Sequence, residues 1–280
     1  MEMKMIMVVA VVGMLCLGGG YLIGNTMSDN TSTISIAGSS SVEPLMKTYT
    51  QAYGSYNDNI RFNLSVSDST DGINKAMNGT VQIGMSSSTV TAAGAHVTQI
   101  CWDAIAVIVS PALYNAGVTN LTPAQLKGIY EGTITNWNAV GSSTSIPITN
   151  NMVYTRESGS GTRSAFEGLI GATSSTVVAQ NFPFVDGTGI MRTTVNGATY
   201  AIGYISLGSV NAATDKTVAI NGVAPSGAAV SDGTYVLKRG FFLVTNTAPT
   251  GDIALFINWI LSPAGQALLG TSYVPLYGPL

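Results

Sequence analysis

Short apolar strands that alternate with helical stretches are the feature that most constrains the fold of this chain. Three of the expected strands end in a turn rich in serine and glycine, and an expected helix follows each turn, at residues 38–41, 67–72 and 158–162. This alternation predicts βα units and an α/β fold. N–H groups at a helix start point outward with the positive end of the helix dipole, so each turn is a potential seat for an oxyanion. Taken singly, each turn could also be an ordinary helix cap, but three of them, one beside Arg156, favour anion binding.

The remaining elements follow from the periodicity of the apolar residues. Thr122 before Pro123 is a typical helix start, because the threonine hydroxyl can cap the first turn and proline suits its first position. The expected strands cover residues 34–36, 61–66, 82–85, 102–109, 146–154, 201–205, 218–223, 235–237 and 240–245. The expected helices cover residues 42–53, 72–78, 122–130, 162–170, 252–261 and 263–269.

The composition indicates a globular protein and limits its partners. Hydrophobic residues make up 46% of the 280 residues, which is typical of one or two folded domains. Charged residues make up only 9%, and the formal net charge is −3. These values argue against nucleic acid as a partner, because proteins that bind it carry basic surfaces.

The chain lacks the residue patterns of common hydrolases and metal sites. His96 is its only histidine, and neither a G-x-S-x-G elbow nor a Cys/His cluster occurs, so no catalytic triad or zinc site is expected. No nucleotide-hydrolysing loop of the form G-x-x-x-x-G-K-[ST] occurs either. We therefore predict a binding protein without enzymatic activity, metal or cofactor. Cys101 is expected to be a small buried residue.

Residues 1–24 are expected to form an export signal or a membrane anchor. A short charged start precedes an apolar run from Ile6 to Gly24, and a helix of that length spans about 28 Å, close to one hydrocarbon core. The length favours retention as an anchor, whereas the glycines leave cleavage open. Lipidation at Cys16 is a third alternative, although such a site requires a small residue directly before the cysteine and Leu15 is not small. Residues 25–33 (NTMSDNTST) are a polar tether, so the rest of the chain is expected outside the cytoplasm.

Residues 156–166 (RESGSGTRSAF) resemble the R-E-x-G-S-G-T-R-x-x-F stretch of the phosphate-binding proteins of phosphate ABC transporters. Further segments resemble the same family in the same order, and the resemblance extends over roughly residues 34–279. They are residues 37–47 (AGSSSVEPLMK), 71–88 (DGINKAMNGTVQIGMSSS), 121–137 (LTPAQLKGIYEGTITNW), 201–208 (AIGYISLG) and 272–276 (SYVPL).

The resemblance implies an α/β, two-lobed type II periplasmic-binding-protein fold with two hinge strands. Lobe one would comprise residues 34–107 and 237–280, and lobe two residues 108–236. A monomer would bind inorganic phosphate in the cleft and deliver it to the permease subunits of an ABC importer in the membrane. The phosphate ligands implied by the matching positions are Ser41, the N–H of Val42, Ser69, Ser87, Arg156, Ser160, the N–H of Gly161, and Thr162.

Arg156 supplies the cationic group of the implied site. Its guanidinium is a planar, permanently charged fork that suits phosphate, whereas the other implied ligands are neutral donors. The alternative role for Arg156 is an ion pair with Glu157 or another carboxylate. Because adjacent residues on an extended strand point to opposite faces, we expect Arg156 and Glu157 to point apart.

The substrate preference rests on fewer residues. Some members of the family have an aspartate at the position of Ser87, where it accepts the proton of bound hydrogen phosphate. A serine hydroxyl can also donate or accept. Asp71 in the second turn is either a proton acceptor for phosphate or the N-cap of helix 72–78. The alternative functions are the same fold binding sulfate, molybdate or tungstate, a hydrolase, and a surface protein that has lost transport.

Overall fold

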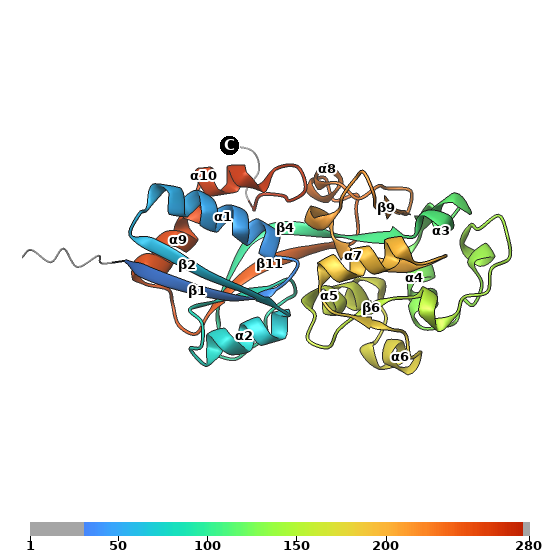
Figure 1. Cartoon of the computed structure of the whole chain (residues 1–280), viewed down its shortest axis with the longest axis horizontal. Helices are drawn as coiled ribbons and strands as arrows, with labels where there is room; N and C mark the ends of the chain where they lie inside the picture. The colour runs from blue at the N-terminus through green and yellow to red at the C-terminus, as the bar shows by residue number, and fades with distance from the viewer. Residues whose placement is uncertain (1–30, 277–280) are drawn as a thin grey trace, which may run out of the picture. The chain divides into compact units, whose positions relative to one another are not determined.

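A computed structural model describes residues 31–276 of the chain (Figure 1). The predictions on the signal or anchor, on lipidation at Cys16 and on most of the polar tether lie outside the described residues. Within residues 31–276, no single helix is long and apolar enough to cross a membrane, and only the bent pair Gly251–Leu261 and Pro263–Leu269 reaches the required length and composition together.

The central sheet of the protein is mixed. Its strand order is β2-β1-β3-β11-β4-β8, with β9 also paired to β4. β1 runs parallel to β2 and β3, whereas β11 is antiparallel to β3 and β4, and β4 is antiparallel to β8. The strands are β1 Ser32–Ser39, β2 Ile60–Ser67, β3 Ile83–Ser86, β4 His96–Val109, β8 Ile202–Ser206, β9 Lys216–Thr217 and β11 Lys238–Thr245.

The first three strands are joined by helices as two βα units. Helix α1 (Glu43–Tyr56) follows β1, and helix α2 (Ser69–Met77) follows β2. Since the strands are parallel, their carboxyl ends meet at one edge of the sheet, with Ser39 of β1 opposite Ser67 of β2. Ligands of α/β proteins bind at such an edge, and the serine-rich turns predicted from the sequence lie there.

Two hydrophobic clusters form the core of the described residues. One includes Ile36 and Met85, and the other contains Tyr204. Strand β4 contributes to both clusters and runs from one group of elements to the other, whereas β11, which pairs with it, contributes to the first cluster (Figure 1). On β4 the clusters change over between Cys101, which is buried as expected, and Ala104. The lobe boundaries predicted from the sequence, at residues 107–108 and 236–237, stay predictions.

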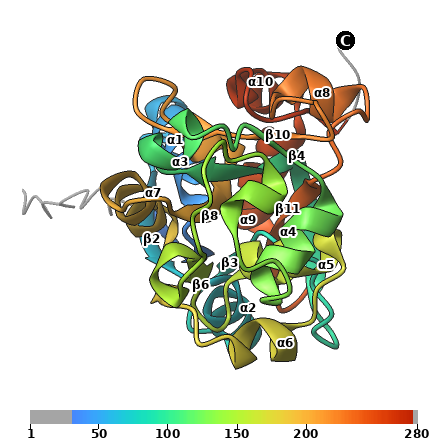
Figure 2. The same ribbon diagram turned by 90° about the vertical axis from the view of Figure 1, so that its right-hand side faces the viewer.

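The remaining elements surround the second cluster and complete the first. Figure 2 shows α7 on one side of β8 and α4 with α5 on the other. Two small parallel sheets pair β10 with β5 and β6 with β7. The elements are α3 Pro111–Asn115, β5 Asn120–Leu121, α4 Pro123–Tyr130, η1 Trp137–Val140, η2 Asn150–Met152, β6 Thr155–Arg156, α5 Gly161–Ile170, α6 Ser174–Ala179, β7 Phe184–Val185, α7 Thr188–Gly197, η3 Leu207–Ser209, β10 Ala219–Ile220, α8 Gly227–Ser231, α9 Gly251–Leu261, α10 Pro263–Gln266 and η4 Ala267–Leu269.

Two expected strands are wrong and one expected helix start is confirmed. Residues 146–154 form no strand, because Pro147 lacks an N–H for a ladder and Asn150–Met152 turns as a 3-10 helix. Residues 235–237 precede β11 instead of forming a strand, and the Tyr235 hydroxyl donates to the carbonyl of Ile105. Thr122 caps α4 in a capping box with Gln125, as its position before Pro123 predicted.

Buried tyrosines make the stability of the fold sensitive to alkaline pH. Tyr204 stacks on Phe166 with ring centroids 4.0 Å apart, and burial raises its pKa to about 12, although bonds from Thr155 and Arg156 oppose the shift. A folded pKa above the unfolded value stabilises the protein below pH 10, and this stabilisation is lost as pH rises to about 12. We expect the free energy of unfolding to fall by up to about 3 kcal/mol over that range from Tyr204 alone.

Urea unfolding followed by fluorescence at a series of pH values measures this effect. The absorbance of ionised tyrosine should show a late rise, because Tyr204, with its pKa raised to about 12, ionises only near that pH or on unfolding. A free energy of unfolding that stays constant between pH 10 and pH 12 would contradict the prediction.

Candidate anion-binding site

Serine side chains at the ends of β1 and β3 and at the start of α2 meet at the carboxyl edge of the parallel strands. The hydroxyl of Ser39 donates to that of Ser87 at 2.9 Å, and the Ser87 N–H donates to Ser69 Oγ at 3.1 Å. Ser41 joins them, because its N–H donates to Ser39 Oγ at 3.3 Å. All four serines are buried, so hydroxyl and N–H groups line this edge without access to bulk water.

Two helix starts on the side of the second cluster contact the same serines. The Ser41 hydroxyl lies 2.7 Å from Thr162 Oγ1 of α5 and 3.1 Å from Thr188 Oγ1 of α7. In the part of the chain that the structure describes, the N–H groups of Gly161 and Thr162, the first two residues of α5, donate no hydrogen bond. These N–H groups are therefore available to an anion at the positive end of the helix.

Gly161 permits the close approach of α5 to the serines. A Cβ atom at this position would lie 2.8 Å from Ser87 Oγ and 2.9 Å from Ser69 Cβ, and it would also clash with Ser69 Oγ. A larger residue would therefore separate the two sides of the site. Gly159 is similarly confined, because it has φ +87° and a Cβ would lie 2.6 Å from Asp68 Oδ1.

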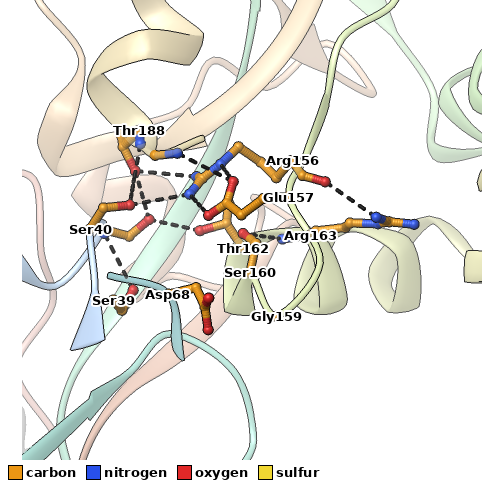
Figure 3. A network of polar contacts seen from close by, with 12 residues as sticks. Ser39, Ser40, Asp68, Arg156, Glu157, Gly159, Ser160, Thr162, Arg163 and Thr188 are labelled. Atoms are coloured by element: carbon orange, nitrogen blue, oxygen red, sulfur yellow. Dashed lines mark hydrogen bonds and ion pairs between the residues drawn. The ribbon is translucent and has the colours of Figure 1, made fainter. Parts of the chain in front are cut away.

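Arg156 reaches the site from the end of β6 and is only 1% exposed (Figure 3). Its Nη1 donates to Thr188 Oγ1 at 3.3 Å, and its Nη2 donates to Ser40 Oγ at 3.2 Å. The N–H of Thr188 also donates to Ser40 Oγ. The guanidinium thus joins the first turn to the start of α7.

The expectation that Arg156 and Glu157 point apart is wrong. Nε and Nη2 of Arg156 donate to the two carboxylate oxygens of Glu157, each at 2.7 Å. The physical reason is that β6 ends at Arg156, so Glu157 lies in a turn where the alternation of strand side chains no longer holds. The N–H of Gly187 also donates to Glu157, at 3.2 Å. The carboxylate therefore holds the guanidinium in one orientation and offsets its charge.

Five of the predicted ligands belong to one hydrogen-bonded network, namely Ser41, Ser69, Ser87, Arg156 and Thr162. Gly161 lies against Ser69 and Ser87. Ser160 is the N-cap of α5, and its hydroxyl accepts from the N–H of Arg163 at 3.3 Å. The N–H of Val42 donates to the carbonyl of Ser39 at 3.0 Å, so an anion would compete with this bond. The assignment of these eight residues as phosphate ligands stays a prediction.

Asp71 is not a helix cap. Helix α2 begins at Ser69, and its N-cap is Asp68, whose carboxylate accepts from the N–H of Asp71 at 2.8 Å. The Asp71 carboxylate pairs with Lys75 one turn later, at 2.7 Å, and this partner lowers the pKa of Asp71. Asp68 displaces Asp71 from the cap because it stands directly before the first helical residue in an extended conformation. The role of Asp71 as a proton acceptor stays a prediction.

Thr188 is a site residue that the sequence analysis missed. It begins α7 directly after the strand β7 and the turn of Asp186 and Gly187, which has φ +81°. This is a fourth strand, turn and helix start of the kind recognised in the other three turns. The sequence signal for this turn is the D-G-T-G run after Val185. The preceding strand β7 has only two residues, so its apolar pattern is too short to predict a strand.

The fold and the site together are typical of α/β proteins that bind a small ligand at the carboxyl edge of a sheet. The chain matches the family described as PBP superfamily domain over residues 25–264. A solved putative phosphate ABC transporter substrate-binding protein with bound phosphate from Clostridium perfringens is 32% identical, with a TM-score of 0.80, over 88% of this chain and 100% of that one. An ABC-type phosphate transport receptor from Vibrio cholerae is 30% identical, with a TM-score of 0.68, over 87% of this chain and all of that one.

A relative named phosphate-binding protein PstS from Borreliella burgdorferi is 27% identical over 86% of this chain and 88% of its own length. The chain therefore belongs to the PBP superfamily and, within it, to the family of phosphate ABC transporter substrate-binding proteins. The resemblance and the fold class predicted from the sequence are confirmed by these matches.

Proposed function

We propose that this protein binds inorganic phosphate as the substrate-binding protein of an ABC importer. The observation that carries the proposal is a buried network in which the Ser41 hydroxyl contacts Thr162 and Thr188, and Thr188 accepts a hydrogen bond from the guanidinium of Arg156. Relatives that are named for phosphate binding and phosphate transport support the same substrate.

The neutral donors explain how a buried anion could be held. Burial of a divalent anion is costly unless its oxygens are hydrogen-bonded. Hydroxyl groups can each donate to a phosphate oxygen, and the N–H groups of Gly161 and Thr162 add donors at the start of α5. Because Glu157 offsets the charge of Arg156, binding would rest on many oriented hydrogen bonds and not on excess positive charge.

Closure around the anion follows from where the donors lie. Ser41, Ser69 and Ser87 follow strands of the first cluster, whereas Arg156 and Thr162 belong to elements around the second. An anion that contacts both sets at once favours the arrangement in which the two sides are close, because only that arrangement offers all the contacts. We infer that release of phosphate to the permease accompanies separation of the two sides.

The wider setting belongs to the same proposal. The protein would act outside the cytoplasmic membrane as a monomer without catalytic activity, held there by residues 1–24 or exported with them cleaved. Its partners would be the permease subunits of the importer. Relatives that serve as transport receptors support this setting.

The alternative is that the same site binds another oxyanion. The Glu157 carboxylate accepts two hydrogen bonds from Arg156, so another residue would have to accept the proton of hydrogen phosphate. If Asp71 accepts that proton, Asp71→Asn should lower the preference for phosphate over sulfate. An unchanged preference would contradict the role of Asp71.

Titration calorimetry of residues 31–280 tests the proposal. The protein is first stripped of carried-over ligand and then titrated with phosphate, sulfate, molybdate and arsenate. We expect one phosphate per chain and weak binding of sulfate. A preference for sulfate or molybdate would change the substrate within the same fold, and no binding of any oxyanion would contradict the proposal.

A further inference from the structure

A buried ion pair joins the two long strands where the hydrophobic clusters change over. Asp103 of β4 lies directly opposite Arg239 of β11 in the antiparallel register. Nε and Nη2 of Arg239 each lie 2.9 Å from Asp103 Oδ2, and the Ser206 hydroxyl at the end of β8 donates to Asp103 Oδ1 at 2.9 Å. Asp103 and Ser206 are fully buried, and Arg239 is 5% exposed.

The ion pair also contacts the candidate site. Nη1 of Arg239 donates to the main-chain carbonyl of Ser87 at 3.3 Å. Ser87 in turn accepts a hydrogen bond from Ser39, and its N–H donates to Ser69. The guanidinium of Arg239 therefore connects the paired strands β4 and β11 to the turn that carries the Ser87 hydroxyl.

Stability alone is a weak reason for this arrangement. Burial of two charges costs free energy that their attraction only partly returns, and well-packed apolar residues often serve as well. Burial raises the pKa of Asp103, although Arg239 and the Ser206 hydroxyl oppose the shift. What an apolar pair cannot supply is a rigid fork of donors that binds a carboxylate and a carbonyl at the same time.

We propose that Arg239 is a positioning residue for anion binding. Held by Asp103 and Ser206, it fixes the main chain of Ser87 and so directs the Ser87 hydroxyl toward the bound anion. This inference rests on the proposed function, because it concerns the same anion site. Arg239 lies outside the predicted ligand set, and its contacts connect the site to the paired strands β4 and β11.

A double-mutant cycle between Arg239 and Ser87 tests the proposal. The variants are Arg239→Lys, Ser87→Ala and the double variant, and the dissociation constant for inorganic phosphate is measured by calorimetry in each. Lysine keeps the charge but not the fork, so we expect affinity to fall by about tenfold. In the Ser87→Ala protein the same substitution should change affinity by less than about threefold, because the hydroxyl that Arg239 directs is already absent.

Two further variants separate positioning from stability. Asp215→Asn removes the charge of another buried carboxylate, whose partners include Asn196 and Asn211, and it should lower the thermal unfolding temperature without changing phosphate affinity. Ser206→Ala removes one bond to Asp103 and should weaken phosphate binding in the same direction as Arg239→Lys. The phosphate affinity of Ser206→Ala tests the positioning role if Arg239→Lys does not fold.

The outcomes are distinct. Equal losses from Arg239→Lys with and without the Ser87 hydroxyl, or unchanged affinity in Arg239→Lys and Ser206→Ala, overturn the positioning role while phosphate binding stands. No phosphate binding by the unmodified protein overturns the proposed function and this inference with it.

Discussion

Phosphate binding is expected to weaken by about two to three powers of ten when Arg156 is replaced by alanine. The substitution removes two donors that reach Ser40 and Thr188, and it leaves the Glu157 carboxylate, whose side chain is 16% exposed, next to the anion without its cation. A buried charge that loses its partner is costly, and here it would also repel the ligand. Calorimetric titration with phosphate measures the change.

Two variants serve as controls for Arg156→Ala. Arg61→Ala makes the same change in net charge on the exposed strand β2, where Arg61 donates only to nearby carbonyls, and it should leave phosphate affinity unchanged. Glu157→Gln keeps the guanidinium but removes the carboxylate charge, so the protein should still bind phosphate, although with a changed affinity. A loss of less than about tenfold in Arg156→Ala would show that Arg156 is not a main determinant of affinity.

The second large effect is expected from Gly161→Ala, which should weaken phosphate binding by about 10- to 100-fold. The new methyl group would lie 2.8 Å from Ser87 Oγ and 2.9 Å from Ser69 Cβ, so α5 could not approach the serines as closely. The clash occurs between the two sides of the site and not within either hydrophobic cluster. Phosphate affinity should therefore fall by the stated factor, whereas the thermal unfolding temperature of the ligand-free protein should change little.

Gly168 offers a matched control in the same helix. A Cβ at Gly168 meets no atom within 4 Å, so Gly168→Ala should leave affinity unchanged and stabilise the protein by about 0.5–1 kcal/mol through its effect on helix propensity. Equal affinities of the Gly161→Ala and Gly168→Ala proteins would mean that close approach at Gly161 is not required for binding.

Local signals in the sequence predicted much of the fold. The Thr122 cap, the βα units formed by β1 and β2 and the start of α5 within RESGSGT depend on residues within a few positions of one another. Expectations failed where the local signal was weak or ambiguous. Residues 146–154 contain apolar residues at strand-like spacing, yet a proline and a turn of asparagines interrupt them.

Distant contacts in the site could not be read from the same signals. The bidentate pair of Arg156 and Glu157 depends on where a two-residue strand ends. The meeting of Asp103 with Arg239 depends on the register of two strands more than a hundred residues apart. No short-range pattern specifies that register.

The sequence by itself determined the α/β alternation, the serine- and glycine-rich turns and the presence of one arginine beside a helix start. These features follow from local propensities and from helix capping, which act over a single turn or strand. Only the tertiary structure decided that Ser41 contacts Thr162 and Thr188, and that Arg239 reaches the carbonyl of Ser87. Such contacts arise when the sheet order and the packing of two hydrophobic cores bring distant turns together, and these depend on the whole chain at once.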